Sequence, residues 1–70
     1  MTIRGEIARN IDKLVKESKL PKLEIAEEVG VSVHTIIDYC KGRSIPTIET
    51  LKKLCIFFDC TYEDIIGSLD

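Results

Sequence analysis

The sequence predicts an all-α protein, a compact bundle of five short helices. No stretch of the 70 residues alternates apolar and polar side chains with the period of two that marks a half-buried strand. Apolar residues recur instead at steps of three and four, which place them on one face of a helix. Residues that start or stop helices divide the chain into five such stretches, and a chain of this length is expected to form one domain, residues 1–70, with one core.

The first helix is expected from about Thr2 to Ser18. Its apolar side chains follow one another at steps of four, four, three and one, so they share one face. These residues are Ile3, Ile7, Ile11, Leu14 and Val15. The pattern predicts an amphipathic helix that buries this face and leaves the opposite one in solvent.

The second helix is expected from Lys22 to Val29. Pro21 precedes it, and the fixed φ of proline suits a helix start. Gly30 offers the positive φ that commonly ends a helix. The expected buried stripe consists of Ile25, Ala26 and Val29, and the exposed side carries Glu24, Glu27 and Glu28.

A third helix follows after a very short turn. Ser32 is the expected N-cap, and the helix runs to about Lys41, where Gly42 terminates it. Only the segment Val29-Gly30-Val31-Ser32 joins this helix to the one before it. Such a connection predicts a tight, right-angled helix pair.

The last two helices begin at threonine caps. Thr47 is expected to cap a helix that ends near Asp59, and Thr61 a helix that ends near Gly67. Asp64 lies three residues after Thr61, which is the spacing of a capping box. The apolar residues at helical spacing in the fourth helix are Ile48, Leu51, Leu54, Cys55 and Phe58.

The residue pattern excludes several classes of protein. No run approaches the ~18 apolar residues of a membrane span and the N-terminus has no signal-peptide core, so we expect a cytoplasmic protein without a membrane partner. The single histidine, His34, has no second imidazole for a zinc site, so no metal is expected. Glu27 and Glu28 do not converge as an acid–base pair, and there is no glycine-rich phosphate loop. We therefore expect no enzyme, no cofactor and no small-molecule ligand.

The chain has three cysteines, Cys40, Cys55 and Cys60. They are too few and too unevenly spaced for a disulfide framework. No cationic cluster flanks any of them, as a reactive thiol of low pKa requires. We therefore expect three buried, reduced thiols.

One longer pattern extends over nearly the whole chain, from Ile7 to Gly67. It contains Leu20, Ile25-Ala26, Gly30-Val31-Ser32, Thr35-Ile36, Tyr39, Gly42, Pro46, Ile48-Glu49-Thr50-Leu51, Leu54 and Phe58. This pattern resembles the Cro/repressor-type (XRE-type) helix-turn-helix family of transcriptional regulators. The resemblance implies a lambda-repressor-like DNA-binding domain whose helix-turn-helix motif spans about residues 22–41, with its second helix in the major groove.

The resemblance also implies roles for individual residues. The family positions that face base edges are matched by Val33, His34, Ile37 and Asp38. The positions that approach DNA phosphates are matched by Lys22, Ser32, Thr35, Lys41 and Arg43. Histidine can bond to a purine N7 and aspartate can accept from the cytosine N4 amine, so such base contacts are chemically reasonable. Two alternatives stay open, a solvated His34 without a ligand and a small interaction patch at Val33 and Ile37.

The chain departs from the family pattern at two pairs of positions. Where the family has Ser-Gln or Thr-Gln at the start of the first motif helix, this chain has Pro21 and Lys22, which removes the capping hydroxyl. Where many members form a partly buried Arg–Glu ion pair, this chain has Val15 and Cys40. Because both charges are replaced together, we expect an apolar contact between Val15 and Cys40 and no stranded charge.

The fourth helix is more apolar than one buried face requires. Residues 54–58 read Leu-Cys-Ile-Phe-Phe, so a second side of this helix must also pack against something. Either the fifth helix covers that side, or two copies of the chain form a homodimer there. The candidate dimer residues are Ile56, Phe57, Tyr62, Ile66 and Leu69.

The net charge of −2 and the pI near 5.3 are not the basic footprint that DNA-binding proteins usually have. Residues 44–70, however, carry five acidic and only two basic side chains, so the acidity lies away from the implied DNA face. We therefore expect a sequence-specific double-stranded DNA-binding regulator, a repressor of bacterial, phage or mobile-element origin. It would bind a pseudo-palindromic operator as a homodimer. The alternative is a protein-interaction module of the same fold that has lost operator binding.

Overall fold

The computed structural model describes residues 3–67. Within them the chain forms five α-helices and no strand, which confirms the predicted all-α class. The helices are α1 (Ile3–Ser18), α2 (Lys22–Val29), α3 (Val33–Lys41), α4 (Ile48–Phe58) and α5 (Tyr62–Ile66). The expected start of the first helix, Thr2, lies outside the described residues.

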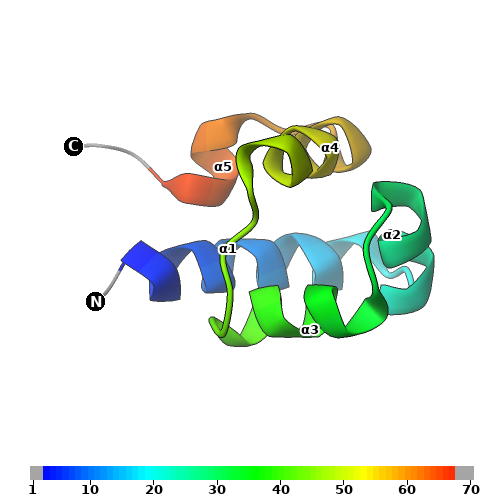
Figure 1. The fold of residues 1–70 in the computed structure, drawn as a ribbon. Helices are drawn as coiled ribbons and strands as arrows, with labels where there is room; N and C mark the ends of the chain where they lie inside the picture. The colour runs from blue at the N-terminus through cyan, green and yellow to red at the C-terminus, as the bar shows by residue number, and fades with distance from the viewer. Residues whose placement is uncertain (1–2, 68–70) are drawn as a thin grey trace.

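The other helices are arranged around α1, the longest of the five (Figure 1). α3 and α5 both contact α1, whereas α2 contacts α3 and α4. α4 and α5 contact each other and lie above α1 in the view of Figure 1, opposite α3. α3 is thus packed against α1 and α2 by one face, and the opposite face is turned outward.

Side-chain caps fix the starts of three helices. Ser32, Thr47 and Thr61 each accept a hydrogen bond from the backbone N–H three residues further on. Asp64 accepts in return from the N–H of Thr61 at 2.9 Å, which completes the expected capping box. Pro21 before α2 makes no side-chain cap, as its missing hydroxyl predicts.

Left-handed residues follow four of the helices. Lys19 follows α1 with φ of 59°, an end that no glycine in the sequence marks. Gly30 and Gly42 follow α2 and α3 with φ of 83° and 77°, a conformation that glycine adopts without a Cβ clash. Asp59 ends α4 with φ of 53°, one of the few other residue types that visit this region. The ends at Gly30, Gly42 and Asp59 were all predicted from the sequence, and the structure confirms them.

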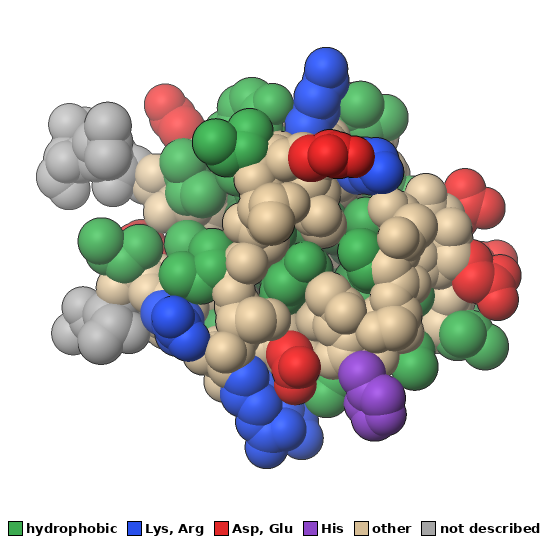
Figure 2. Space-filling view, viewed as in Figure 1, with side chains coloured by type: hydrophobic (Ala, Val, Ile, Leu, Met, Phe, Trp, Pro, Cys, Tyr) green, Lys and Arg blue, Asp and Glu red, His purple; other side chains and the backbone are tan. Residues whose placement is uncertain are grey.

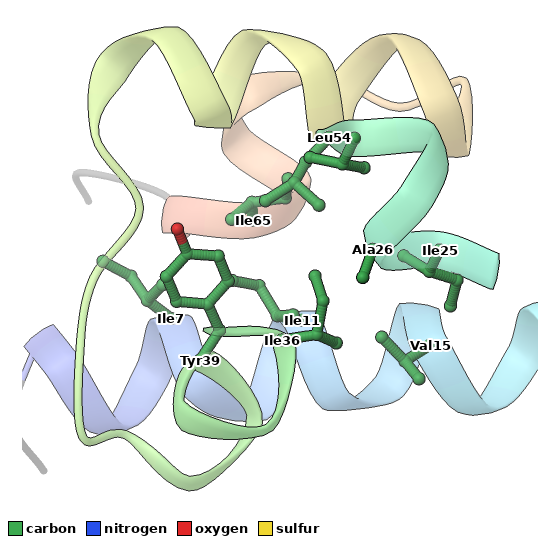
Figure 3. Close-up of a cluster of buried hydrophobic side chains, with 10 residues drawn as sticks. Ile7, Ile11, Val15, Ile25, Ala26, Ile36, Tyr39, Leu54 and Ile65 are labelled. Carbon is green, nitrogen blue, oxygen red and sulfur yellow. The ribbon is translucent and has the colours of Figure 1, made fainter. Parts of the chain in front are cut away.

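One core joins all five helices (Figure 3). It contains Ile7, Ile11 and Val15 from α1, Ile25, Ala26 and Val29 from α2, Ile36 and Tyr39 from α3, Leu54 from α4, and Ile65 from α5. Asn10 adds a polar link, because its side-chain Nδ2 donates to the backbone oxygen of Ile65 at 2.8 Å. This bond ties the five-residue α5 to the middle of α1.

Two apolar residues that we expected on buried faces are exposed instead. Ile3 is 75% and Ile48 is 83% solvent-accessible. Each is the first residue of its helix, where the side chain leans back toward the N-terminus and away from the bundle. Leu14 is only partly buried.

The two positions that replace the family's ion pair lie at the core. Val15 is fully part of it, and Cys40 packs against the same cluster from α3. No charged side chain is buried within residues 3–67, so none is left stranded.

Candidate nucleic-acid interface

α3 carries the four residues that the resemblance places at base edges, and three of them lie away from the core. Ile36 and Tyr39 are buried against the core, so His34, Ile37 and Asp38 lie on the sides of the helix that turn away from it. Val33 packs partly against the core. His34 is exposed, whereas Val33, Ile37 and Asp38 are half-buried. The imidazole of His34 is therefore the side chain on this face with the greatest freedom to meet a ligand.

The start of α3 holds two of the predicted phosphate contacts. The Oγ of Ser32 accepts from the N–H of Thr35 at 3.1 Å, and the two hydroxyls lie 2.9 Å apart. The helix N-terminus adds a positive partial charge at this point. Hydroxyls and backbone N–H groups at such an end suit a phosphate oxygen.

The other end of α3 brings Asp38 and Arg43 together. The backbone N–H of Arg43 donates to the backbone oxygen of Asp38 at 2.9 Å, because Gly42 turns the chain back on itself. The Arg43 guanidinium lies 3.8 Å from the Asp38 carboxylate, with the side chains 66% and 41% exposed. An ion pair this open contributes about 1 kcal/mol or less, so a stronger ligand can displace it.

Two lysines frame a shallow hollow beside the same face. Lys22 from α2 and Lys41 from α3 line it together with Ile37. Asp12 is also at its edge, and its carboxylate is 2.8 Å from Lys16 Nζ. The tertiary fold thus brings cations from two helices to the same hollow as an aliphatic residue.

Arg4 is a basic residue of this region that sequence reasoning missed. Its Nη1 donates to the backbone oxygen of Arg43 at 3.1 Å, across 39 residues of chain. No local pattern signals this contact, because only the packing of α1 on α3 brings the first turn of α1 to the loop after α3.

The candidate dimer residues lie on α4 and α5. Ile56 is 70% exposed, so α5 does not cover this side of α4 as the alternative explanation required. Tyr62 and Ile66 are also exposed, whereas Phe57 is half-buried and stacks edge-on with Phe58 at 5.1 Å between ring centroids. Leu69 lies outside the described residues.

Basic side chains occur on both sides of the molecule in Figure 2. One group of Lys and Arg side chains lies at the lower edge, beneath α3, with the histidine on the same edge, and others lie at the top, over α4. Hydrophobic side chains reach the surface on the upper side, over α4 and α5. The exposed glutamates of α2 are Glu24, Glu27 and Glu28.

A comparison with protein families decides what this arrangement is. A family model described as "Helix-turn-helix" matches residues 11–65, which include all of α2 and α3. The chain belongs to this helix-turn-helix family. The XRE-type resemblance of the sequence is thereby confirmed.

Two known proteins are similar to this helix-turn-helix chain. Antitoxin PezA from Streptococcus pneumoniae serotype 4 (strain ATCC BAA-334 / TIGR4) is 36% identical over 61 residues, which is 87% of this chain and 39% of PezA. The solution structure of the SOS-response transcriptional repressor LexA from Eubacterium rectale superposes with a TM-score of 0.88 at 28% identity. The superposition covers 96% of this chain and 71% of the LexA chain. The chain thus spans about two fifths of the length of PezA.

The family and the structural neighbour support a DNA-binding helix-turn-helix regulator. Within residues 3–67 no three metal-ligating side chains come together. No helix in the described part of the chain has the length and apolar character needed to cross a membrane.

Proposed function

We propose that this protein is a repressor that recognises a specific double-stranded DNA sequence by inserting α3 into the major groove. The observation that carries the proposal is the outward face of α3. An exposed imidazole lies there between a capped helix start and a loop that carries Arg43, with Lys22 and Lys41 alongside. Base-reading groups flanked by phosphate-binding groups are what sequence-specific recognition requires.

Four side chains of α3 are proposed to read base edges. His34 would donate to or accept from a purine, and Asp38 would accept from the N4 amine of cytosine. Val33 and Ile37 offer aliphatic surface to a thymine methyl group. A good contact of this kind discriminates against the wrong base by about 1–3 kcal/mol.

The phosphate contacts are proposed to come from both ends of the motif. They are Lys22, Ser32, Thr35, Lys41 and Arg43. Arg4 would add to them, because its guanidinium is already bonded to the loop of Arg43. Each cation that neutralises a phosphate releases counterions, so binding should weaken as salt is added.

The operator is proposed to be pseudo-palindromic because the protein binds it as a homodimer. The exposed apolar side chains Ile56, Tyr62 and Ile66 on α4 and α5 support this part of the proposal. Two-fold dimers of helix-turn-helix domains place their recognition helices about 34 Å apart, one turn of DNA. A small acidic protein gains most from such pairing, because single-domain electrostatic binding is weak.

Repression and a bacterial, phage or mobile-element origin are proposed from the similar proteins. The structural neighbour is itself named a transcriptional repressor, and both similar proteins come from bacteria. A bound dimer would act by occluding the polymerase. Its place of action would be the cytoplasm, where such DNA is found.

Selection of bound duplexes from a random pool tests the proposal. At low salt we expect an enriched motif with two inverted half-sites one helical turn apart. The affinity for that motif should fall linearly with salt on logarithmic axes. If no motif is enriched at low salt, the protein is a protein-interaction module that keeps the fold without operator binding.

A further inference from the structure

Two of the three cysteines meet at the end of α4. The backbone N–H of Cys60 donates to the backbone oxygen of Cys55 at 3.0 Å, and the backbone N–H of Asp59 donates to that of Ile56 at 3.3 Å. With Asp59 in the left-handed conformation, these bonds form a Schellman motif. This motif places the side chains of the first and last residues of the turn against each other, and here both are cysteines.

The two thiols are within hydrogen-bonding contact of each other, and both are free. The prediction of three buried thiols was wrong, because Cys40, Cys55 and Cys60 are all only half-buried. Cys55 and Cys60 line one surface hollow together with Ile56 and Tyr62. Cys40 is on α3, where it packs against the core and lines a different hollow. The fold therefore separates one pair of adjacent, reachable thiols from a third thiol that has no cysteine beside it.

We propose that Cys55 and Cys60 form an oxidisable dithiol, which a hydroperoxide converts to an intramolecular disulfide. The thiolate of one cysteine attacks an oxygen of hydrogen peroxide, which forms a sulfenic acid and releases hydroxide. The second thiol attacks that sulfur, forms the S–S bond and loses its proton, and water leaves. In total two thiols and one peroxide give one disulfide and two water molecules, with the sulfurs oxidised and the peroxide reduced.

The environment of the pair sets the pH dependence of disulfide formation. Burial, reinforced by the neighbouring thiol, raises the pKa of Cys60 to about 11. Burial also raises the pKa of Cys55, but the hydrogen bond from Cys60 opposes that effect. The carboxylate of Asp64 also raises the pKa of both thiols, and that of Asp59 raises the pKa of Cys60. Because the thiolate is the nucleophile, closure is slow at pH 7 and accelerates as the pH rises toward 9.

The position of the pair links oxidation to self-association, an inference that rests on the proposed homodimer. The hollow that contains both sulfurs is bounded by Ile56 and Tyr62, two of the candidate dimer residues. A disulfide holds its sulfurs about 2.05 Å apart, closer than two thiols in contact, and so draws the start of α5 toward α4. The oxidised and reduced chains should therefore differ in their dimer dissociation constants.

Thiol counting on the full chain tests the dithiol itself. The reduced protein is treated with hydrogen peroxide at pH 8, and free thiols and intact mass are then measured. We expect the thiols to fall from three to one with the loss of two hydrogens, and peptide mapping to find a link between Cys55 and Cys60. A disulfide between two chains, a link to Cys40, or three surviving thiols would each overturn the proposal.

Serine variants supply the matched controls. Cys55→Ser and Cys60→Ser should each form no intramolecular disulfide, whereas Cys40→Ser should close it at the wild-type rate. Circular dichroism of each reduced variant shows whether the fold is kept. If Cys40→Ser fails to close the disulfide while folded, the assignment of the pair is wrong.

Sedimentation of the reduced and oxidised chains separates this inference from the proposed dimer. Closure of the disulfide in a chain that is monomeric at all concentrations would retain the dithiol and refute the dimer. A reduced chain that dimerises but never forms the disulfide would retain the dimer and refute the dithiol. Equal dimer dissociation constants for the two forms would refute the coupling between them.

Discussion

At the scale of single residues, the proposed recognition face of α3 combines an exposed side chain with a pair of opposite charges. The exposed imidazole of His34 shares this face with the half-buried Ile37, whereas Val33 packs partly against the core. Asp38 and Arg43 neutralise each other across 3.8 Å in the free protein. DNA would have to replace this contact, since phosphates attract Arg43 and repel Asp38.

Removing one phosphate-binding cation should weaken binding to every duplex alike. Arg43→Ala and Lys22→Ala are each expected to lower affinity for operator and random DNA by a similar factor, and to reduce the salt slope by about one. Binding isotherms at several salt concentrations measure both effects. Lys13→Ala is the matched control, because Lys13 lies at a hollow between α1 and α5 with Asp64. An unchanged slope in Arg43→Ala would place the DNA footprint elsewhere.

Removing Asp38 should act in the opposite direction on random DNA. Asp38→Ala frees the Arg43 guanidinium and deletes a negative charge near the phosphates, so we expect affinity for random duplexes to rise by a few-fold. The same variant should lose discrimination at one C·G position of the operator by about 1–3 kcal/mol. Competition between operator and single-base variants measures the second effect. Retained discrimination would remove Asp38 from the base-reading set.

At the scale of elements, short helices depend on caps, turns and a few tertiary bonds. α3 has nine residues, and its start and end are fixed by Ser32 and Gly42. α5 has only five, too few to be stable alone. Its capping box, the buried Ile65 and the bond from Asn10 hold it in place.

Loss of the Asn10 bond should loosen α5. Asn10→Ala removes the donor to the Ile65 oxygen, so we expect the free energy of unfolding to fall by about 1–2 kcal/mol. Denaturant unfolding measures the loss, and hydrogen exchange should show it first in α5. Glu17→Ala, an exposed change on the same helix, should stay within about 0.5 kcal/mol of the wild type. Equal protection of α5 in Asn10→Ala would show that the bond does not hold this helix.

At the scale of the whole molecule, α3 and the apolar surface of α4 and α5 lie on opposite sides of α1 (Figures 1 and 2). The net charge of −2 is the sum over the whole chain, and residues 44–70, which include α4 and α5, contribute five acidic and two basic side chains to it. A dimer formed through α4 and α5 would leave both copies of α3 free to meet DNA. Self-association and DNA binding should therefore be separable by substitution.

A charge placed on the proposed dimer surface should split the dimer without unfolding the chain. Ile56→Asp is expected to raise the dimer dissociation constant at least tenfold, because Ile56 is 70% exposed in the single chain and would be buried only by a partner. Sedimentation measures the constant, and thermal unfolding measures the fold. Ile48→Asp is the control, an exposed isoleucine of the same helix outside the candidate set. A monomeric wild type at high micromolar concentration would refute the dimer.

The local elements could be predicted because their signals are local. Ser32, Thr47 and Thr61 bond to their own helices, and Gly30, Gly42 and Asp59 turn the chain within one or two residues. Such signals depend on backbone geometry and not on distant partners. The family resemblance added the helix-turn-helix family, which the family match confirms, and the assignment of its motif to α2 and α3, which stays a prediction. The individual DNA contacts remain predictions.

The sequence by itself determined the five helices, their boundaries and the family. Tertiary structure alone decided which side chains meet across the fold: Arg4 with the loop of Arg43, Asn10 with Ile65, and Cys55 with Cys60 around the end of α4. It also decided that Ile3 and Ile48 stay exposed although they fit the apolar pattern of their helices. The reason is physical. Helix periodicity fixes the direction of each side chain around its own axis, but burial and partnership depend on where the other helices lie.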